Sequence, residues 1–377
     1  MNIVFVSNAI TPHQIPVCDE LSKLENVSVK FIESINIDKN TLPIGWQTSC
    51  RRDYVVSFDF LSRNREAIIE EIFAADVVIY GSGDYSLLKR RLAADSLTFL
   101  YSERIYKKWK DLLKVPIHFF KFSQMYGKYQ NLYLLCASAF AAKDYGLLSL
   151  FRKKSYKWGY FTSVENEVAN STCRFTSPLK MLWCSRFIDW KHPELAVKLA
   201  QRLKTAGYSF QLDMIGEGEM LNSMKTYVTV NGLGDCVNFL GTMPNKQVHE
   251  QMRKHDIFLF TSDKGEGWGA VANEAMSNGC VLIASDEIGS VPYLVVNQNN
   301  GVMFKSKDIN SLYSVVKDIF DKPKMCMALS NNAIRTIRQV WSPKNAAESL
   351  VRLSNDLLND KACSIQYGPC SNKNNSL

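Results

Sequence analysis

Several features that define other protein classes are missing from this chain of 377 residues. Its ten cysteines form no Cys-x-x-Cys pair and no zinc-type spacing, and some lie inside apolar runs, as Cys184 and Cys280 do. Scattered thiols of this kind are typical of buried, reduced cysteines in a reducing compartment. No stretch of about 18 uncharged apolar residues occurs, so we predict no membrane-spanning helix.

What is present is ordinary for a globular protein: 46% hydrophobic and 22% charged residues, with a net charge of +8. At about 150 residues per domain, the length favours two domains. Apolar runs at 3–6, 27–32, 76–80 and 98–101 alternate with helical stretches such as 16–24, which predicts a parallel α/β sheet in the first half.

The most specific pattern is a pair of acids, Glu266 and Glu274, eight positions apart. An apolar strand at 256–261 precedes them, three glycines at 265, 267 and 269 form a turn, and a short helix runs to a stop at Asn278 and Gly279. Free amides at a helix start bind anions. Isolated acids in such places are often only solvated or mildly helix-stabilising, but the joint pattern favours a binding site.

A carboxylate repels a phosphate but accepts hydrogen bonds from hydroxyls, so the ligand indicated is a phosphate flanked by sugars. A nucleotide sugar is such a ligand. We then expect Glu266 to hold the transferred sugar and Glu274 the ribose. The diphosphate would lie over Gly269, Ala270 and Val271.

With these motifs the sequence resembles glycosyltransferase family 4, a group of retaining enzymes with the GT-B fold. The matching runs are 266–269 with 273–276, then 279, 281–285 and 289–292, and an upstream segment, 181–196. The resemblance covers roughly 176–345. It implies two facing Rossmann-like domains with a central cleft, and a C-terminal helix that crosses back to the first domain.

In the upstream segment the resemblance makes Arg186 and Lys191 the residues that hold the donor diphosphate. A planar guanidinium fork and a point charge suit an oxyanion leaving group, although most Arg and Lys residues are plain surface cations. With Glu266 they are the expected catalytic residues. The expected donor-binding set is Arg186, Lys191, Gly216, Leu240, Glu266, Gly267, Trp268, Gly269, Ala270, Val271 and Glu274.

The first half is expected to receive the acceptor. Ligands of parallel sheets bind at the carboxyl ends of the strands, which points to loops at 8–13, 81–84 and 102–104. His13 and Glu103 are the candidate acceptor-side residues, although a lone His or Glu is more often structural. The glycine pair that the family often has in its first loop is missing here, so a donor contact from that loop is not expected.

The expected organisation is an acceptor-binding domain at 1–165, a nucleotide-sugar-binding domain at 166–342, a crossover helix at 343–359 and a disordered tail at 360–377. Residues 159–178 are rich in Thr, Ser, Asn and Glu and read as the connection. The last helix has Ser342 as its cap and Pro343 at its first position.

Positive charge is concentrated between 86 and 160, where fifteen Lys and Arg face four Asp and Glu, a balance of +11. Ile105, Trp109, Leu112 and Leu113 repeat there at helical spacing among lysines. The pattern fits an interfacial helix on an anionic membrane. It equally fits a domain core with a solvated basic face. A nucleic-acid partner is disfavoured because no such module is recognisable.

These features predict a retaining hexosyltransferase that moves a sugar from a nucleoside diphosphate to a glycan, lipid-linked acceptors included, in surface polysaccharide biosynthesis. The chain has no Asp-x-Asp, the motif with which the other major glycosyltransferase fold holds a metal. We therefore expect no cofactor and no metal. The expected location is the cytoplasm or the inner face of the cytoplasmic membrane. The alternatives are a nucleotide-sugar epimerase of related fold and a non-catalytic sugar-binding module.

Overall fold

A computed structural model describes residues 1–37, 52–163 and 177–373, without the side chains of 323 and 324. The chain divides into two compact units: Met1–Ser163 with Trp341–Leu377, and Val164–Val340. The expected boundary between 165 and 166 lies outside the described residues, as does most of the expected connection at 159–178.

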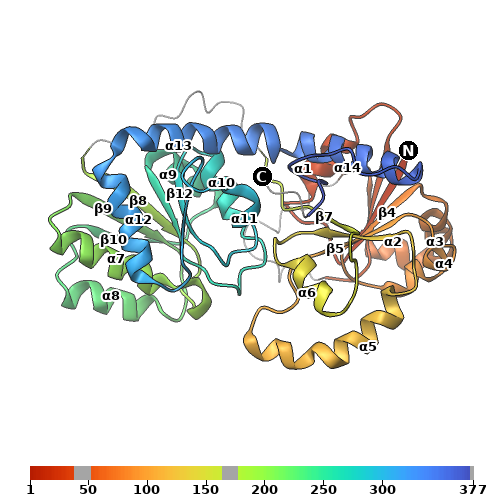
Figure 1. Cartoon of the computed structure of the whole chain (residues 1–377), viewed down its shortest axis with the longest axis horizontal. Coiled ribbons are helices and arrows are strands. Elements are labelled where there is room, and N and C mark those ends of the chain that lie inside the picture. The colour runs from red at the N-terminus through yellow and green to blue at the C-terminus, as the bar shows by residue number, and fades with distance from the viewer. Residues whose placement is uncertain (38–51, 164–176, 374–377) are drawn as a thin grey trace. The chain divides into compact units, whose positions relative to one another are not determined.

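The first unit is built on a parallel sheet that has seven strands within the described residues, in the order β3-β2-β1-β4-β5-β6-β7 (Figure 1). The strands are β1 (Asn2–Ser7), β2 (Ser28–Glu33), β3 (Val55–Val56), β4 (Val77–Tyr80), β5 (Thr98–Ser102), β6 (Leu132–Cys136) and β7 (Ser155–Lys157). Their apolar side chains are almost all buried, as continuous apolar runs in a parallel sheet require. The four strands expected in the first half are confirmed as β1, β2, β4 and β5.

The helices of the first unit include the last helix of the chain. They are α1 (Ile15–Leu21), α2 (Phe58–Arg63), α3 (Arg65–Ala74), η2 (Tyr85–Leu88), α4 (Lys89–Ala93), η3 (Trp109–Lys114), α5 (Val115–Tyr126), α6 (Ala141–Leu147) and α14 (Pro343–Leu358). The predicted start of α14 is confirmed: the Ser342 side chain accepts a hydrogen bond from the Asn345 amide at 3.1 Å. α14 packs against α1, so the chain returns to the first unit after passing through the second.

The second unit has a parallel sheet of six strands within the described residues, in the order β10-β9-β8-β11-β12-β13. They are β8 (Leu179–Cys184), β9 (Phe210–Ile215), β10 (Val237–Gly241), β11 (Ile257–Phe260), β12 (Val281–Ser285) and β13 (Val302–Phe304). Because β8 and β11 are parallel neighbours, the loops that follow them leave the same edge of the sheet. These loops carry the two sequence motifs.

Helices cover both faces of the second sheet (Figure 1). One group contains η4 (Asp189–Lys191), α7 (Pro193–Thr205), α8 (Leu221–Val230) and α12 (Ile309–Asp321), and the other α9 (Asn245–Lys254), α10 (Val271–Ser277), α11 (Val291–Leu294), α13 (Pro323–Arg335) and η5 (Thr336–Val340). The predicted helix after Gly269 is α10, and it ends before Asn278 as expected.

The expectation of a disordered tail is wrong for residues 360–373. The Lys157 amide donates to the Ser371 carbonyl at 2.9 Å, and the Cys370 amide donates to the Lys157 carbonyl at 2.7 Å. Cys370 and Ser371 are fully buried. The polar composition of the tail suggested disorder, but backbone hydrogen bonds to β7 fix its conformation regardless of side-chain type.

Two expectations about the whole chain concern its helices and its cysteines. None of the helices within the described residues is long and apolar enough to cross a membrane. No disulfide joins the eight cysteines of that part; six of them are buried, Cys280 among them, and Cys184 is half-buried. Cys50 and Cys173 lie outside it.

Candidate functional site

The loop after β8 carries two cations beside one aromatic ring. Arg186 is exposed, and its guanidinium carbon lies 5.9 Å from the centroid of the Trp190 ring. The Nζ of Lys191 lies 4.2 Å from the same centroid. Both distances are within the range in which a cation is attracted to the ring face. Trp190 therefore positions the two residues that the sequence proposed for a diphosphate.

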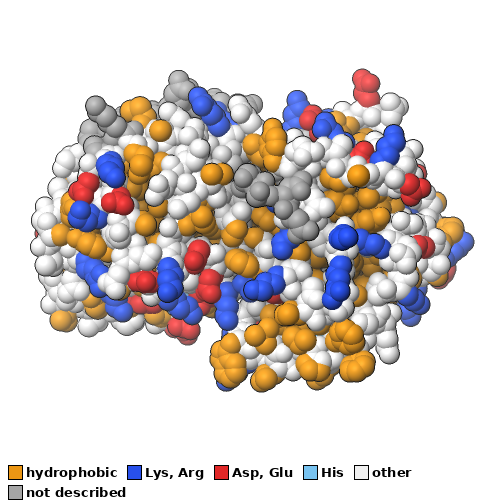
Figure 2. All heavy atoms as spheres, viewed as in Figure 1, with side chains coloured by type: hydrophobic (Ala, Val, Ile, Leu, Met, Phe, Trp, Pro, Cys, Tyr) orange, Lys and Arg blue, Asp and Glu red, His pale blue; other side chains and the backbone are white. Residues whose placement is uncertain are grey.

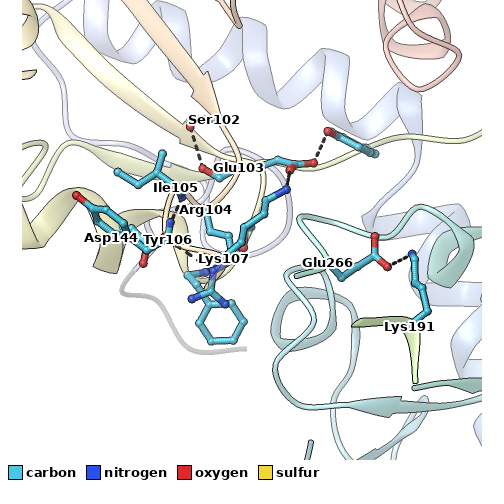
Figure 3. A network of polar contacts seen from close by, with 12 residues as sticks. Ser102, Glu103, Arg104, Ile105, Tyr106, Lys107, Asp144, Lys191 and Glu266 are labelled. Atoms are coloured by element: carbon cyan, nitrogen blue, oxygen red, sulfur yellow. Dashed lines mark hydrogen bonds and ion pairs between the residues drawn. The ribbon is translucent and has the colours of Figure 1, made fainter. Parts of the chain in front are cut away.

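Lys191 forms an ion pair with Glu266, which joins the two sequence motifs in one place (Figure 3). The two side chains are only 12% and 11% exposed. Burial lowers the pKa of Lys191, Glu266 opposes that effect, and nearby Arg186 adds to it. A carboxylate has about four acceptor positions, so Glu266 retains capacity for a further donor such as a sugar hydroxyl.

A second layer of contacts fixes this pair. The Thr261 hydroxyl donates to the Lys191 carbonyl at 2.7 Å and accepts from the Trp183 indole at 2.8 Å. The Asp263 amide donates to the Trp190 carbonyl at 3.0 Å. The loops after β8 and β11 are thus tied together through their backbones, so Lys191 and Glu266 are held by a preorganised frame.

His192 reinforces the same frame from a left-handed backbone conformation with φ of 50°. Its Nδ1 lies 2.8 Å from Glu194 Oε1 and its Nε2 lies 3.3 Å from Asp263 Oδ2. Burial lowers the pKa of His192, but the hydrogen bonds to Asp263 and Glu194 outweigh burial and raise the pKa to about 9. The site therefore contains a charged imidazolium at neutral pH.

Asp263 is the anchor of this cluster. Burial raises the pKa of Asp263, but hydrogen bonds from His192, Lys307 and the Gly265 amide outweigh burial and hold the pKa far below its usual range. The Lys307 ammonium lies 2.6 Å from Asp263 Oδ2. Sequence reasoning gave neither His192 nor Asp263 a role, because a lone His and a lone Asp in loops have no diagnostic spacing.

Glu274, the second acid of the motif, is also nearly buried, with its side chain 12% exposed. Its Oε1 accepts from the Asn245 side chain at 3.5 Å and lies 3.7 Å from His249 Nε2. Burial and the charge of Glu274 raise the pKa of Cys184 to about 12, while Lys191 acts in the opposite direction. The charges of Glu274 and Lys191 thus both act on the thiol of Cys184, the last residue of β8.

Two of the glycines of the motifs bring backbones close together. A Cβ on Gly216 would lie 1.9 Å from the Ser185 carbonyl oxygen, and one on Gly218 would lie 2.5 Å from the Phe187 carbonyl oxygen. The Phe187 amide donates to the Glu217 carbonyl at 2.8 Å. These glycines therefore hold the Arg186 loop against the end of β9, a scaffold role that the sequence did not assign.

The remaining donor-side candidates differ in accessibility. The Trp268 side chain is buried and donates to Asn273 Oδ1 at 2.9 Å, so it is a packing residue and only its backbone can meet a ligand. Leu240 in β10 is 37% exposed. Gly267 is buried, whereas Gly269, Ala270 and Val271 are partly exposed at the start of α10. Gly269 has a positive φ of 82°, which residues other than glycine rarely adopt, and a Cβ there would also lie 2.4 Å from the Phe260 ring.

In the first unit both acceptor-side candidates contact Tyr160. The rings of His13 and Tyr160 are stacked, with centroids 5.2 Å apart and planes 8° apart. The Tyr160 hydroxyl donates to Glu103 Oε1, and Lys107 Nζ lies 2.7 Å from Glu103 Oε2 (Figure 3). Sequence reasoning missed Tyr160, which follows β7 and is separated from Glu103 by 57 positions.

Comparison with solved structures defines the fold class. The chain is similar to Anabaena Alr3699/HepE, solved in complex with UDP, with a TM-score of 0.67, 12% identity and coverage of 96% of this chain and 100% of that one. It is also similar to a glycosyltransferase from Rickettsia africae, with a TM-score of 0.65, 13% identity and coverage of 96% and 99%. The α/β fold is therefore the two-domain GT-B fold of glycosyltransferases.

Within this fold, residues 166–336 match the family model described as glycosyl transferases group 1. The amylovoran biosynthesis glycosyltransferase AmsK of Erwinia amylovora is 28% identical over 144 residues, which are 37% of this chain and 35% of that protein. The lipopolysaccharide core biosynthesis mannosyltransferase LpcC of Rhizobium leguminosarum is 27% identical over 139 residues, 37% of this chain and 38% of that protein. The chain thus spans about a third of the length of these curated relatives, and the resemblance to glycosyltransferases is confirmed over 166–336.

Proposed function

We propose that the protein is a hexosyltransferase that moves a sugar from a nucleoside diphosphate sugar to a glycan. The observation that carries the proposal is the buried Lys191–Glu266 pair beside Arg186 at the carboxyl edge of the second sheet. The two cations can bind a diphosphate, and the carboxylate can accept hydrogen bonds from sugar hydroxyls. All three residues lie in the segment that matches group 1 glycosyltransferases.

In the proposed reaction the bond between the anomeric carbon and the diphosphate oxygen breaks, and a bond from the acceptor hydroxyl oxygen to the same carbon forms on the same face. The acceptor proton passes to the leaving phosphate oxygen. Arg186 and Lys191 stabilise the negative charge that develops on the diphosphate. Glu266 positions the transferred sugar, Glu274 the ribose, and the amides of 269–271 the phosphates.

We propose that this chemistry requires no metal ion. The positive charge that the diphosphate needs is supplied by Arg186 and Lys191, with the Lys307 and His192 cations behind Asp263. The described residues contain no group of three or more His, Cys, Asp or Glu side chains placed to hold a metal. Excess chelator should leave transfer unchanged. Activity that is lost with chelator and restored by magnesium or manganese would contradict this part of the proposal.

For the acceptor, we propose a glycan of a surface polysaccharide, lipid-linked acceptors included, handled in the cytoplasm or on the inner face of its membrane. The support comes from relatives whose names mention amylovoran, colanic acid and lipopolysaccharide core. In the first unit, His13, Glu103 and Tyr160 are the residues proposed to face this acceptor.

The first experiment is a thermal-shift screen of nucleoside diphosphates, beginning with UDP, because ligand binding raises the melting temperature by mass action. We expect one base to raise the melting temperature of the wild type and a smaller rise for Lys191→Ala. The matched control is Lys198→Ala, an exposed lysine of α7. An equal rise in all three proteins would remove Lys191 from the site.

The second experiment separates transfer from the alternatives. The protein is incubated with the selected nucleotide sugar, with and without a glycan acceptor, and sugar products are analysed. A glycosyltransferase gives product only with acceptor, apart from slow hydrolysis. A new nucleotide sugar formed without acceptor would identify an epimerase, and binding without any turnover would identify a sugar-binding module.

A further inference from the structure

The segment formed by η3 and α5, residues 109–126, exposes large apolar side chains along one side. Trp109 is 64% exposed, Leu113 73%, Ile117 69% and Phe120 69%. Figure 2 shows hydrophobic side chains gathered over α5, the part of this segment that Figure 1 labels. Contiguous apolar surface of this kind marks an interaction site. Of the residues that the sequence left open between core and membrane face, Trp109, Leu112 and Leu113 are exposed, whereas Ile105 packs against the core.

The opposite side of α5 already has its partners within the first unit. His118 and Phe122 are stacked with ring centroids 5.2 Å apart, and Phe122 contacts Tyr126 at 5.7 Å and Tyr145 at 6.3 Å. The Met125 carbonyl accepts a hydrogen bond from the Tyr85 hydroxyl at 2.8 Å. A helix that is apolar on both sides is normally buried on both, so the outer side of α5 needs a further apolar environment.

The charged residues around the stripe indicate which apolar environment this is. From 104 to 130 the chain has six lysines and one arginine but a single acid, Asp111. Lys114 pairs with that acid at 3.0 Å, and Lys107 pairs with Glu103 at 2.7 Å. Lys108, Lys110 and Lys121 are exposed at the margin of the apolar stripe. A second copy of the same face would bring like charges together, so the partner must be anionic.

We propose that the stripe formed by Trp109, Leu113, Ile117 and Phe120 inserts into the surface of an anionic phospholipid membrane. Lys108, Lys110 and Lys121 contact the headgroups, and their alkyl stems lie along the apolar side chains. The Lys110 ammonium lies 5.7 Å from the Trp109 ring centroid, and Lys121 lies 5.9 Å from that of Phe122. Trp favours the boundary between hydrocarbon and headgroups. A continuous apolar stripe bordered by lysines specifies no hydrogen-bond register, which suits fluid lipid better than a folded protein.

The same segment begins a few residues after Glu103, the acceptor-side candidate. Lys107, which lies just before η3, is bonded to Glu103 (Figure 3). Membrane contact through 109–126 would therefore hold the loop after β5 close to the lipid surface. The membrane inference itself rests on exposure and charge and is independent of the proposed function.

Vesicle sedimentation of the full chain without nucleotide sugar tests the inference. Wild-type protein should sediment with vesicles of phosphatidylglycerol and phosphatidylcholine, bind phosphatidylcholine alone poorly, and be released as salt approaches about 1 M, where the screening length is about 3 Å. The combined variant Leu113→Ser, Ile117→Ser, Phe120→Ser should lower partitioning at least about tenfold. These side chains are exposed, so the variant should keep the wild-type melting temperature.

Charge reversal of Lys108, Lys110 and Lys121 to Glu should lower partitioning at least about a hundredfold, at about fivefold or more per lysine. The matched controls use exposed residues elsewhere: Phe60→Ser with Val230→Ser for the apolar set, and Lys225, Lys246 and Lys254 to Glu for the charged set. Both controls should bind as the wild type does.

Three outcomes would overturn the inference. They are equal binding to neutral and anionic vesicles, no binding to either, and unchanged binding of both variant sets. Self-association of the lipid-free chain that disappears in the apolar variant would assign the stripe to a second copy. A light-scattering measurement on the same samples detects it.

Discussion

Arg91 in the first unit and Lys191 in the second are both largely buried cations, but their surroundings differ. Arg91 is fully buried in α4, and its guanidinium donates to backbone carbonyls and one hydroxyl. The acceptors are the carbonyls of Ile72, Phe73, Ala75, Asp76 and Leu97 and the hydroxyl of Thr98. Burial lowers the pKa of Arg91 to about 10. Its hydrogen bonds connect α4 to α3 and to the loop before β5, so Arg91 has a structural role.

Lys191 instead has one charged partner, Glu266, and lies at the edge where strands end. An anionic ligand can compete for its charge, because a single ion pair can rearrange, whereas a guanidinium bonded to several carbonyls cannot. A buried cation surrounded by carbonyls thus stabilises the fold, and a buried cation with one carboxylate is available for chemistry. Substitutions at the two positions should separate stability from turnover.

The largest expected effect is on stability, from Arg91→Met. The substitution leaves several buried carbonyls without a donor, so the free energy of unfolding should fall by about 3 kcal/mol or more. Arg90→Met is the matched control, since Arg90 is exposed and its pair with Glu70 should contribute less than about 1 kcal/mol. Urea unfolding of both variants measures the difference. Equal losses would show that the carbonyl contacts of Arg91 add nothing.

The next effect is on turnover. Lys191→Ala, and separately Arg186→Ala, should lower turnover about a hundredfold, the size typical of losing one preorganised charge stabiliser. Both variants should remain folded. The assay is sugar transfer under saturating donor, with Lys198→Ala as the control. Undiminished transfer by a well-folded Lys191→Ala protein would refute the catalytic role and weaken the proposed function.

His192 should make stability depend on pH. Its pKa in the folded chain, about 9, lies above the ordinary value of 6.5. The imidazolium therefore stabilises the fold fully below about pH 6.5, and this contribution is lost as pH rises through about 9. Melting temperatures measured between pH 6 and 10 should fall more steeply in the wild type than in His192→Asn. Parallel curves would show that His192 is not charged in this frame.

The smallest effect concerns Trp190, whose ring lies beneath both cations of the site. A cation–π contact is worth about 0.5–1 kcal/mol at partly exposed sites, so Trp190→Ala should weaken nucleoside diphosphate binding about two- to fivefold. Trp190→Phe keeps a ring and should recover part of the loss. Titration calorimetry with the base chosen by the thermal-shift screen measures the change. A larger loss in Trp190→Phe than in Trp190→Ala would rule out the ring contact.

The sequence was sufficient for the parallel sheets and for the two motifs, because apolar runs and glycine-rich turns are local signals. The strand expected at 98–101 is β5, Thr98–Ser102, and the helix expected after Gly269 is α10. The ion pair between Lys191 and Glu266 could not be predicted from such local signals. It joins residues 75 positions apart, and only the pairing of β8 with β11 brings their loops together.

Other features of the site also had no local signal in the sequence. The burial of the Trp268 side chain depends on the neighbouring helix and loop, against which it packs. The left-handed conformation of His192 has no residue-type signal, since it is not a glycine. The sequence pattern of Ile105, Trp109, Leu112 and Leu113 fits either a core or a membrane face, and only the exposed area of these side chains distinguishes the two.

The C-terminal segment has a consequence for solubility. β7 is the last strand in its sheet, and a strand at that position presents unpaired amide and carbonyl groups that recruit other chains. The backbone of 370–373 occupies those groups, with a bridge between Tyr156 and Asn372. The segment therefore covers the edge strand of the sheet. Truncation of the chain after Leu358 would expose the backbone groups of β7, which could then pair with strands of other chains and cause aggregation.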